Sequence, residues 1–167
     1  MKAIQERCFS CGGRFRQTDG PTHAYMSSTP GCWATYGDLL AREYSDHDLF
    51  QRVHRLTVDS YALQHPGDPS DARARRSVWV HYLALTLKLR DHCGDEEILA
   101  RMRILARRPF PVIPARPKSF DVTHADVMAT DPAAHAKAVR AWAICSLSAW
   151  DCLADGAEGI QTGRILT

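Results

Sequence analysis

Apolar side chains recur at three- and four-residue spacing along most of this chain, and that spacing is typical of amphipathic helices. The pattern predicts helices over residues 33–44, 46–64, 77–90, 95–108 and 132–154. The segment 77–89 is apolar almost all round, so its helix is expected in the middle of a bundle. Alternation across Val78, Val80 and Tyr82 could also indicate a strand there, but the length of the segment favours a helix.

Capping and turn residues set the ends of the second predicted helix. Ser45 or Asp46 can cap its start, because their side-chain oxygens accept hydrogen bonds from free backbone N–H groups. Pro66 disfavours helix at the residue before it, so the helix is expected to end there. A polar loop is then expected over residues 66–76.

The C-terminal half of the chain carries its own start and stop signals. Thr123 and Asp126 match a capping box at the start of a short helix, and Asp131 suits the start of the last long helix. Gly156 is a plausible end for that helix. The segment 109–117 contains four prolines, so we expect it to be extended and to cross the outside of the bundle.

These patterns predict a mainly α fold, a helical bundle with an N-terminal loop-rich metal knuckle. Residues 1–156 are expected to form a single domain, in which the knuckle, 1–32, packs on the bundle, 33–156. Residues 157–167 are expected to be a flexible tail. The knuckle segment is rich in turn residues and poor in apolar ones, so a bound metal would have to supply the missing stabilisation.

Three cysteines in this first segment have the spacing of metal ligands. Cys8 and Cys11 form a C-x-x-C pair followed by two glycines, and Cys32 lies further on. Thiolates two residues apart can reach one tetrahedral ion, and Zn²⁺ is the usual occupant of such a site. A closed site needs a fourth ligand, for which His23 is the nearest candidate. The other imidazoles that could fold back onto the site are those of His54, His65 and His81.

Other interpretations of the cysteines stay open. The three thiols of the first segment could simply be small buried side chains. A thioredoxin-like redox pair is disfavoured, since no strand is predicted before Cys8 and no βαβ pattern surrounds it. Cys145 and Cys152 lie seven residues apart in the last predicted helix and are expected in the core.

One face of the second predicted helix carries further candidate site residues. At about 100° per residue, His54, Tyr61 and His65 align, and Asp59 lies close by. The two histidines are three turns apart, about 16 Å along the axis, so they could bracket a ligand but cannot share one metal ion. His81 on the neighbouring apolar helix could form the opposite wall of a pocket. An ordinary exposed face with surface histidines is the alternative.

Composition narrows the classes of partner. The chain has 167 residues, a net charge of +2 and six cysteines. A nearly neutral charge does not favour a nucleic acid or an anionic membrane as partner. No apolar run approaches the ~18 residues of a membrane span, and the first residues show no signal-peptide region. We therefore expect a cytoplasmic protein without a membrane partner, whose cysteines are metal ligands or buried thiols rather than disulfides.

Several segments together resemble a bacterial family of small proteins of uncharacterised function. They are CFSCGG, DGPTHAYMSSTPGCW, LAREYS, VHRLTVDSYALQHPG and RRPFPVIP, and the likeness spans roughly residues 8–150. The family's motifs fall on Cys8, Cys11, Gly12, His23, Tyr25, Cys32, Trp33, His54, Asp59, Tyr61, Gln64 and His65. The resemblance implies that the metal knuckle and the histidine helix form one functional unit. It brings no substrate and no reaction.

Two functions are consistent with these residues. The first is a metal-dependent enzyme or small-molecule binder with a histidine-lined pocket between the knuckle and the helix. There a water on an open metal position could be activated, or His54 could act as general base. Its candidate catalytic residues are His54, Asp59, Tyr61, His65 and His81. The second is a non-enzymatic structural-zinc module that acts through protein–protein interaction or regulation. The shared helix face slightly favours the pocket. Whether the chain is an enzyme stays open, and we find no nucleophile elbow, phosphate loop or dinucleotide fingerprint in it.

Overall fold

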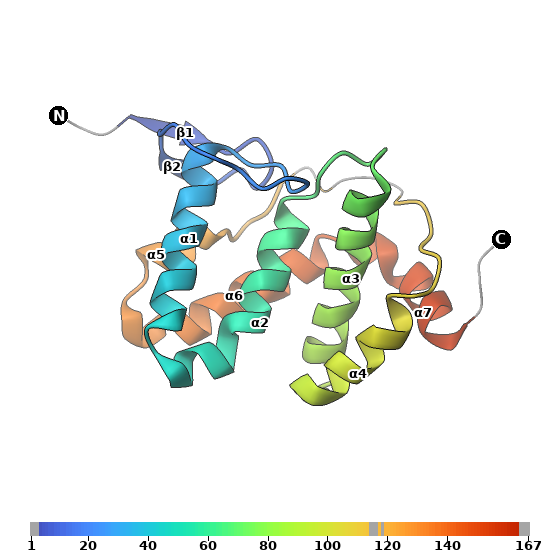
Figure 1. The fold of residues 1–167 in the computed structure, drawn as a ribbon. Helices are drawn as coiled ribbons and strands as arrows, with labels where there is room; N and C mark the ends of the chain where they lie inside the picture. The colour runs from blue at the N-terminus through green and yellow to red at the C-terminus, as the bar shows by residue number, and fades with distance from the viewer. Residues whose placement is uncertain (1–3, 114–116, 118, 164–167) are drawn as a thin grey trace.

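A computed structural model of the chain describes residues 4–113, 117 and 119–163, and these are mainly helical (Figure 1). A two-stranded antiparallel hairpin, β1 (Gln5–Arg7) and β2 (Arg14–Arg16), precedes the helices. The helices are α1 (Pro30–Tyr44), α2 (His47–Gln64), α3 (Ala72–Leu89), α4 (Asp95–Leu105), α5 (His124–Ala129), α6 (His135–Ser148) and α7 (Ala154–Thr162). Single 3-10 turns, η1 (Pro132–Ala134) and η2 (Asp151–Leu153), precede α6 and α7. The predicted mainly helical fold with a cysteine-rich N-terminal region is therefore confirmed.

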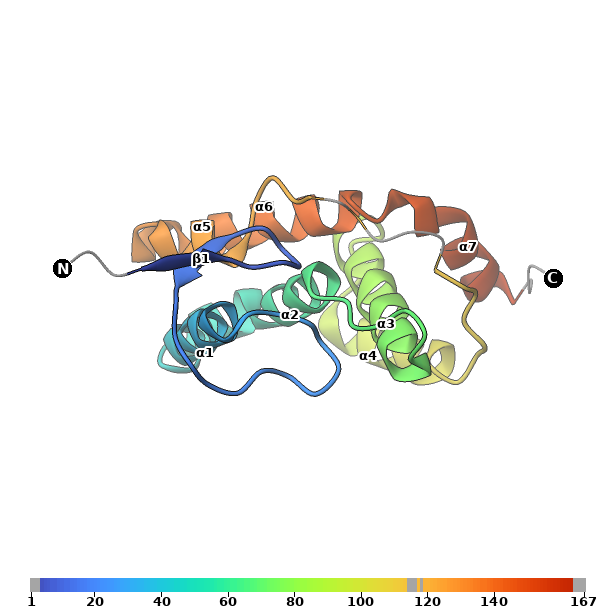
Figure 2. The same cartoon turned by 90° about the horizontal axis from the view of Figure 1, so that it is seen from above.

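The helix α2 is the centre of the bundle. It packs against α1, α3 and α6, and the hairpin packs against α1. Figure 2 shows α5, α6 and α7 following one another along one side of the molecule, with α1 to α4 on the other. Trp79, Trp142 and Trp150 are buried between these layers, and burial of such large apolar side chains is the main source of stability in a bundle. Among the described residues, no helix combines the length and the apolar character that a membrane span requires.

Several predicted helix ends coincide with observed capping contacts. The side chain of Asp46 accepts a hydrogen bond from Leu49 N (3.0 Å) at the start of α2, which ends just before His65. Thr123 and Asp126 form the predicted capping box of α5. Asp131 accepts from Ala133 N (2.8 Å) and begins the helical segment that continues into α6. These ends follow from local chemistry, because each cap satisfies a backbone group that the helix leaves unpaired.

The structure differs from the prediction at the start of α3. This helix begins at Ala72, because the side chain of Asp71 accepts from Arg73 N (2.8 Å) and caps it. The arginines that follow Asp71 therefore lie in a helix, and the prediction of a loop through residue 76 is wrong for its last part. The proline-rich segment crosses α3 where Pro111 O accepts a hydrogen bond from the indole of Trp79 (2.8 Å). Residues 114–116 of that predicted extended segment lie outside the described residues.

The C-terminal region also differs from a single helix over 132–154. The helix α6 ends at Ser148, and η2 redirects the chain before α7. Cys152 in η2 is exposed and Cys145 in α6 is only partly buried, so the expectation that both lie in the core is wrong. The helix α7 continues beyond the expected boundary at residue 156, and its Ile160 is buried.

Candidate metal centre

Cys8 and Cys11 lie in the turn that joins β1 to β2. Cys8 N donates to Gly13 O and Gly12 N donates to Cys8 O, both at 2.9 Å, which closes a tight loop around the two thiols. Gly12 has a φ of +79°, a conformation that side chains other than glycine rarely adopt. Gly13 N points at the sulfur of Cys11 (3.4 Å), as backbone amides do in metal knuckles. The C-x-x-C-Gly-Gly pattern therefore encodes the turn as well as the two sulfurs.

The strand before Cys8 corrects one sequence argument. A redox pair was disfavoured partly because no strand is predicted there, yet β1 ends at Arg7. The strand escapes prediction because it is only three residues long and largely polar. It pairs with β2 in an antiparallel hairpin, which is not the βαβ setting of a thioredoxin-like motif.

Cys32 and His65 reach the same place from two helices. Cys32 lies in the first turn of α1, whose N-cap Thr29 accepts a hydrogen bond from Cys32 N (3.4 Å). His65 directly follows α2, and its Nδ1–H donates to Tyr61 O (2.7 Å). That hydrogen bond leaves the lone pair of Nε2 free, and Nε2 lies 3.1 Å from the sulfur of Cys32. The imidazole is thus held in the orientation and tautomer of a metal ligand.

Together these residues form a compact group of four donors. The sulfurs of Cys8, Cys11 and Cys32 and a ring nitrogen of His65 all lie within 4.8 Å of one another. All four side chains are buried, with 0 to 1% of their surface exposed. In a tetrahedral zinc site with Zn–S bonds of about 2.3 Å, neighbouring donors are about 3.8 Å apart. The group is therefore compatible with a bound metal ion.

Burial and mutual proximity shift the acidities of the thiols. Burial raises the pKa of Cys32, because the thiolate is poorly solvated in the protein interior. Hydrogen bonds from the Cys11 and Cys32 thiols lower the pKa of Cys8, because they stabilise its thiolate. The cluster thus favours one thiolate that two neighbouring thiols stabilise. A divalent cation would permit all three to ionise, since a coordinated thiol gives up its proton.

Aromatic rings enclose the cluster. Tyr61 stacks on His65 (ring centroids 3.9 Å apart) and on Tyr36 (3.7 Å), and its hydroxyl lies 3.7 Å from the sulfur of Cys32. Burial raises the pKa of Tyr61, so the phenol keeps its proton. The rings exclude water from the donors on the side that faces the bundle.

His124 is a second buried imidazole at the cluster, which the sequence analysis missed. Its Nε2–H donates to Cys32 O (3.1 Å) and lies 3.8 Å from the sulfur of the same residue. Its ring stacks on Phe15 of the hairpin (4.6 Å), so α5 closes over the site. Burial lowers its pKa to about 3, so the ring is neutral. The capping box was the only signal at this position, and it indicates a helix start rather than a site.

The structure places the other predicted site residues elsewhere. His23 packs against Tyr25 and Trp33, and its Nδ1 accepts from Tyr25 N (3.4 Å). The four-donor group therefore contains His65, one of the histidines that the sequence left open, and not His23. His81 donates through Nδ1 to Asp59 (2.7 Å), in a separate pair on α2 and α3.

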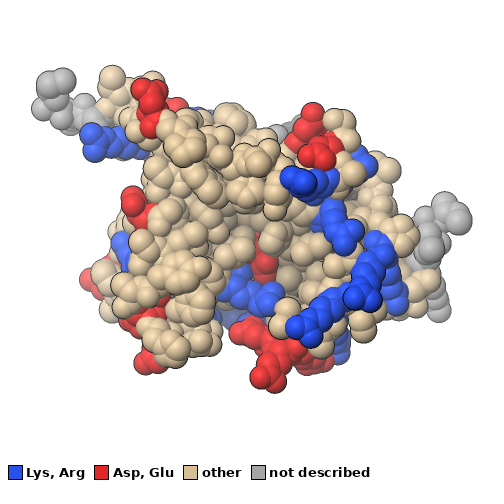
Figure 3. All heavy atoms as spheres, in the orientation of Figure 1, with Lys and Arg blue, Asp and Glu red and all other residues tan. Residues whose placement is uncertain are grey.

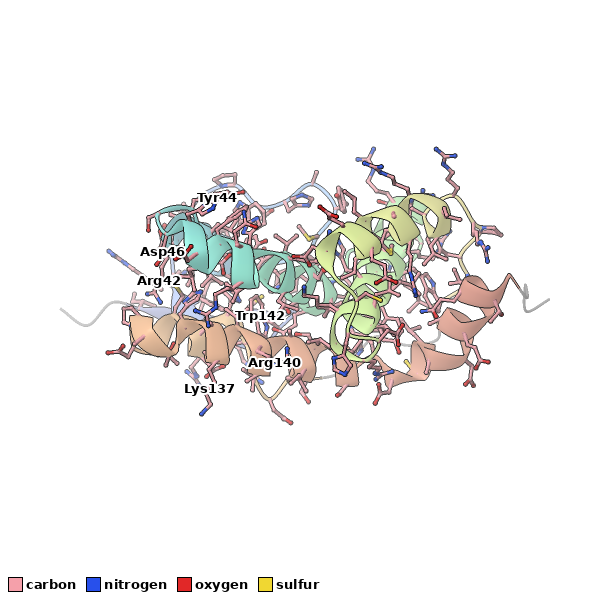
Figure 4. The ribbon with its side chains drawn as sticks, turned by 90° about the horizontal axis from the view of Figure 1, so that it is seen from below. Arg42, Tyr44, Asp46, Lys137, Arg140 and Trp142 are labelled. Carbon is pink, nitrogen blue, oxygen red and sulfur yellow. The ribbon has the colours of Figure 1, made fainter. Side chains whose placement is uncertain are left out.

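His54 belongs to a second buried polar cluster, around Glu43. The carboxylate of Glu43 has no exposed surface and accepts hydrogen bonds from His54 Nδ1 (2.9 Å), His135 Nε2 (3.3 Å) and the Thr57 hydroxyl. Arg42 donates to the other ring nitrogen of His135 (3.4 Å). Figure 4 shows Arg42 between the start of α2 and α6. This cluster joins α1, α2 and α6, and its contacts with α2 lie near the middle of that helix.

Gly31 sets how closely the hairpin approaches α1. A Cβ at this position would lie 2.1 Å from Arg16 O, and Gly31 N also donates to Glu6 (3.3 Å).

Gly31→Ala is therefore expected to lower the free energy of unfolding by about 2 kcal/mol, because the strand must move away from Cys32. The matched control is Gly37→Ala in the same helix, where a Cβ would meet nothing within 4 Å. It is expected to stabilise the protein by about 0.5–1 kcal/mol. Urea unfolding of both variants checks this, and equal effects would contradict it.

Comparison with known proteins assigns the chain to a family. Residues 6–151 match the model of a family of unknown function, DUF5946, which confirms the expected likeness to an uncharacterised family. No curated protein and no solved structure gave a match. The matched segment includes all four residues of the donor group and most of the bundle. The chain therefore belongs to the DUF5946 family, a family of unknown function.

Proposed function

We propose that this chain binds one zinc ion through Cys8, Cys11, Cys32 and His65, and that the metal is structural. The observation that carries the proposal is the group of four buried donors within 4.8 Å of one another, supplied by the hairpin, α1 and the end of α2. No single element holds more than two of them. The ion would therefore tie the hairpin to the bundle.

The donor chemistry supports zinc. Three thiolates and one imidazole form a Cys₃His set, which structural zinc sites use in tetrahedral geometry. Hard cations such as Mg²⁺ and Ca²⁺ prefer oxygen ligands, and no carboxylate of a described residue belongs to the group. His65 donates a hydrogen bond to Tyr61 O, and the backbone N–H of Gly13 points at the sulfur of Cys11. Such contacts from outside the ligand set orient the ligands of a metal site.

A closed site supports a structural role over a catalytic one. A catalytic zinc keeps a coordination position open for water or substrate, whereas four protein ligands fill a tetrahedron. His54, the expected general base, is engaged by Glu43 and by the Tyr44 hydroxyl (3.4 Å). It borders a cavity of about 350 Å³ with Phe50 and Arg55, but this cavity does not include the four donors. We therefore favour the non-enzymatic zinc module, whose helices provide a surface for a partner.

The test is the metal content of His65→Ala and His23→Ala. Protein purified without chelators is expected to contain about one Zn²⁺ per chain by elemental analysis. His65→Ala should lose most of this metal, because only three ligands remain. His23→Ala should keep it, because this imidazole contacts aromatic rings and not the group. Metal-free wild-type protein, or loss of metal only from His23→Ala, would contradict the proposal.

A further inference from the structure

The net charge of the chain is small, but the basic and acidic residues are unevenly distributed along it. Residues 72–90 and 98–120 contain eleven lysines and arginines and no aspartate or glutamate. The rest of the chain contains ten cations and all nineteen acidic residues. The net charge of +2 does not favour a nucleic acid as partner, but it is a sum over the whole chain. It does not describe the local excess of cations in these two segments.

The fold brings these cationic segments together on α3 and α4. The two helices pack against each other, and Arg76 of α3 donates to Ala106 O at the end of α4. Figure 3 shows a band of basic side chains over this part of the molecule. We call the following residues the arginine band: Arg73, Arg75, Arg76, Arg101, Arg103, Arg107 and Arg108.

Most of the band keeps its positive charge available. Arg75 donates to the carbonyl oxygens of Pro69 and Ser70 (2.8 Å each), which orients the guanidinium without neutralising it. Arg101 forms an ion pair with Glu97 (2.6 Å), the one ion pair in the band with a described residue. Apart from Arg101, the cations of the band form no ion pair with a described residue, so they give this surface a positive potential.

Arg103 and Arg107 are the members of the band that we select for the test. Both side chains are exposed, and neither side chain forms a hydrogen bond or ion pair with a described residue. Arg103 is in the last turn of α4, and Arg107 lies two residues beyond the end of this helix. Four residues span about 6 Å along a helix axis, so the two Cα atoms are separated by about that distance in this direction. Leu99 and Ile104 on the same helix are 48% and 62% exposed, so the outer face of α4 is accessible to a partner.

We propose that the arginine band binds the phosphate backbone of double-stranded DNA. A row of guanidinium groups suits a polymer of regularly repeated phosphates, because each group can donate two parallel hydrogen bonds to a phosphate. A small anion would meet only one or two members of the band. The acidic residues at the start of α4, Asp95 to Glu97, limit the contact to its C-terminal half. This inference does not depend on the metal being zinc.

The experiment measures binding of a fluorescent mixed-sequence 20-base-pair DNA duplex to the full chain by anisotropy, from about 50 to 200 mM salt. The test variant is Arg103→Gln with Arg107→Gln. The matched control is Lys137→Gln with Arg140→Gln, which removes the same charge. Figure 4 shows Lys137 and Arg140 pointing away from the bundle on α6, on the side opposite α2 and α4. A labelled peptide of twelve aspartates is the second probe.

Wild type and control are expected to bind the duplex in the micromolar range at low salt, and more weakly as salt rises. The test variant should bind about tenfold more weakly at low salt, and the slope of log affinity against log salt should fall by about 2 in magnitude. Equal weakening of test and control variants, or no duplex binding at about 50 mM salt, would overturn the proposal. So would tighter binding of the aspartate peptide, which would indicate a protein partner. Self-association that disappears in the test variant would assign the band to a second copy of this chain.

Discussion

Cys32→Ser is expected to lose the bound metal and to lower the free energy of unfolding by about 3 kcal/mol or more. Cys32 is the donor that links α1 to the hairpin, and it has no exposed surface. Serine is a poor zinc ligand, so the remaining donors cannot form a closed tetrahedron. The hairpin buries little apolar surface beyond Phe15 and the two cysteines, so without the metal it is expected to detach from the bundle. Zinc content and urea unfolding measure the two effects.

Two controls separate metal loss from the loss of any cysteine. Cys152→Ser changes an exposed cysteine and is expected to leave metal content and stability unchanged. A strong chelator should destabilise the wild-type protein about as much as Cys32→Ser does, and it should have no further effect on that variant. A chelator that removes metal without lowering the stability of the wild type would contradict a structural role for the ion.

Glu43→Ala is expected to destabilise the protein by about 3–5 kcal/mol, which is the second large effect. The carboxylate of Glu43 is fully buried and accepts hydrogen bonds from His54, His135 and Thr57. Its removal leaves these buried donors without a partner, and unpaired buried polar groups are costly. Urea unfolding measures the loss. The metal content should stay at the wild-type level, because Glu43 does not belong to the four-donor group.

Glu43→Gln tests the same cluster with less disturbance of shape. The amide oxygen can still accept from Thr57, but the amide nitrogen cannot accept from an imidazole N–H. An intermediate destabilisation is therefore expected. Glu158→Ala, which removes an exposed carboxylate on α7, is the control and should change stability by less than about 0.5 kcal/mol. Equal effects of Glu43→Ala and Glu158→Ala would mean that the buried cluster adds nothing to stability.

The two predictions concern two places along one helix. His54 binds Glu43 near the middle of α2, and His65 lies at the four-donor group just after its end. Helical periodicity puts both histidines on one face of α2 and predicts a shared pocket. The structure assigns them to separate clusters about 16 Å apart along the axis, so α2 connects the four-donor group to the buried carboxylate of Glu43.

The sequence by itself determined the helices and half of the donor group. Helices form through hydrogen bonds between residues four apart, so apolar spacing and capping residues such as Asp46 and Thr123 are enough to locate them. Cys8 and Cys11 are equally local, because two residues and the glycines that follow bring both sulfurs into one turn. The family resemblance was also carried by local motifs.

Only the tertiary structure decided which histidine completes the group and which charges gather on one surface. Cys32 and His65 are 33 residues apart, and their distance depends on how α1 packs against α2, which no spacing rule encodes. Several histidines had comparable sequence signals, and packing selected His65 because α2 ends at the knuckle. The burial of Glu43 likewise depends on packing, because His135 of α6 lies against its carboxylate. The arginine band arises in the same way, because α3 and α4 join two cationic segments that are separated along the chain.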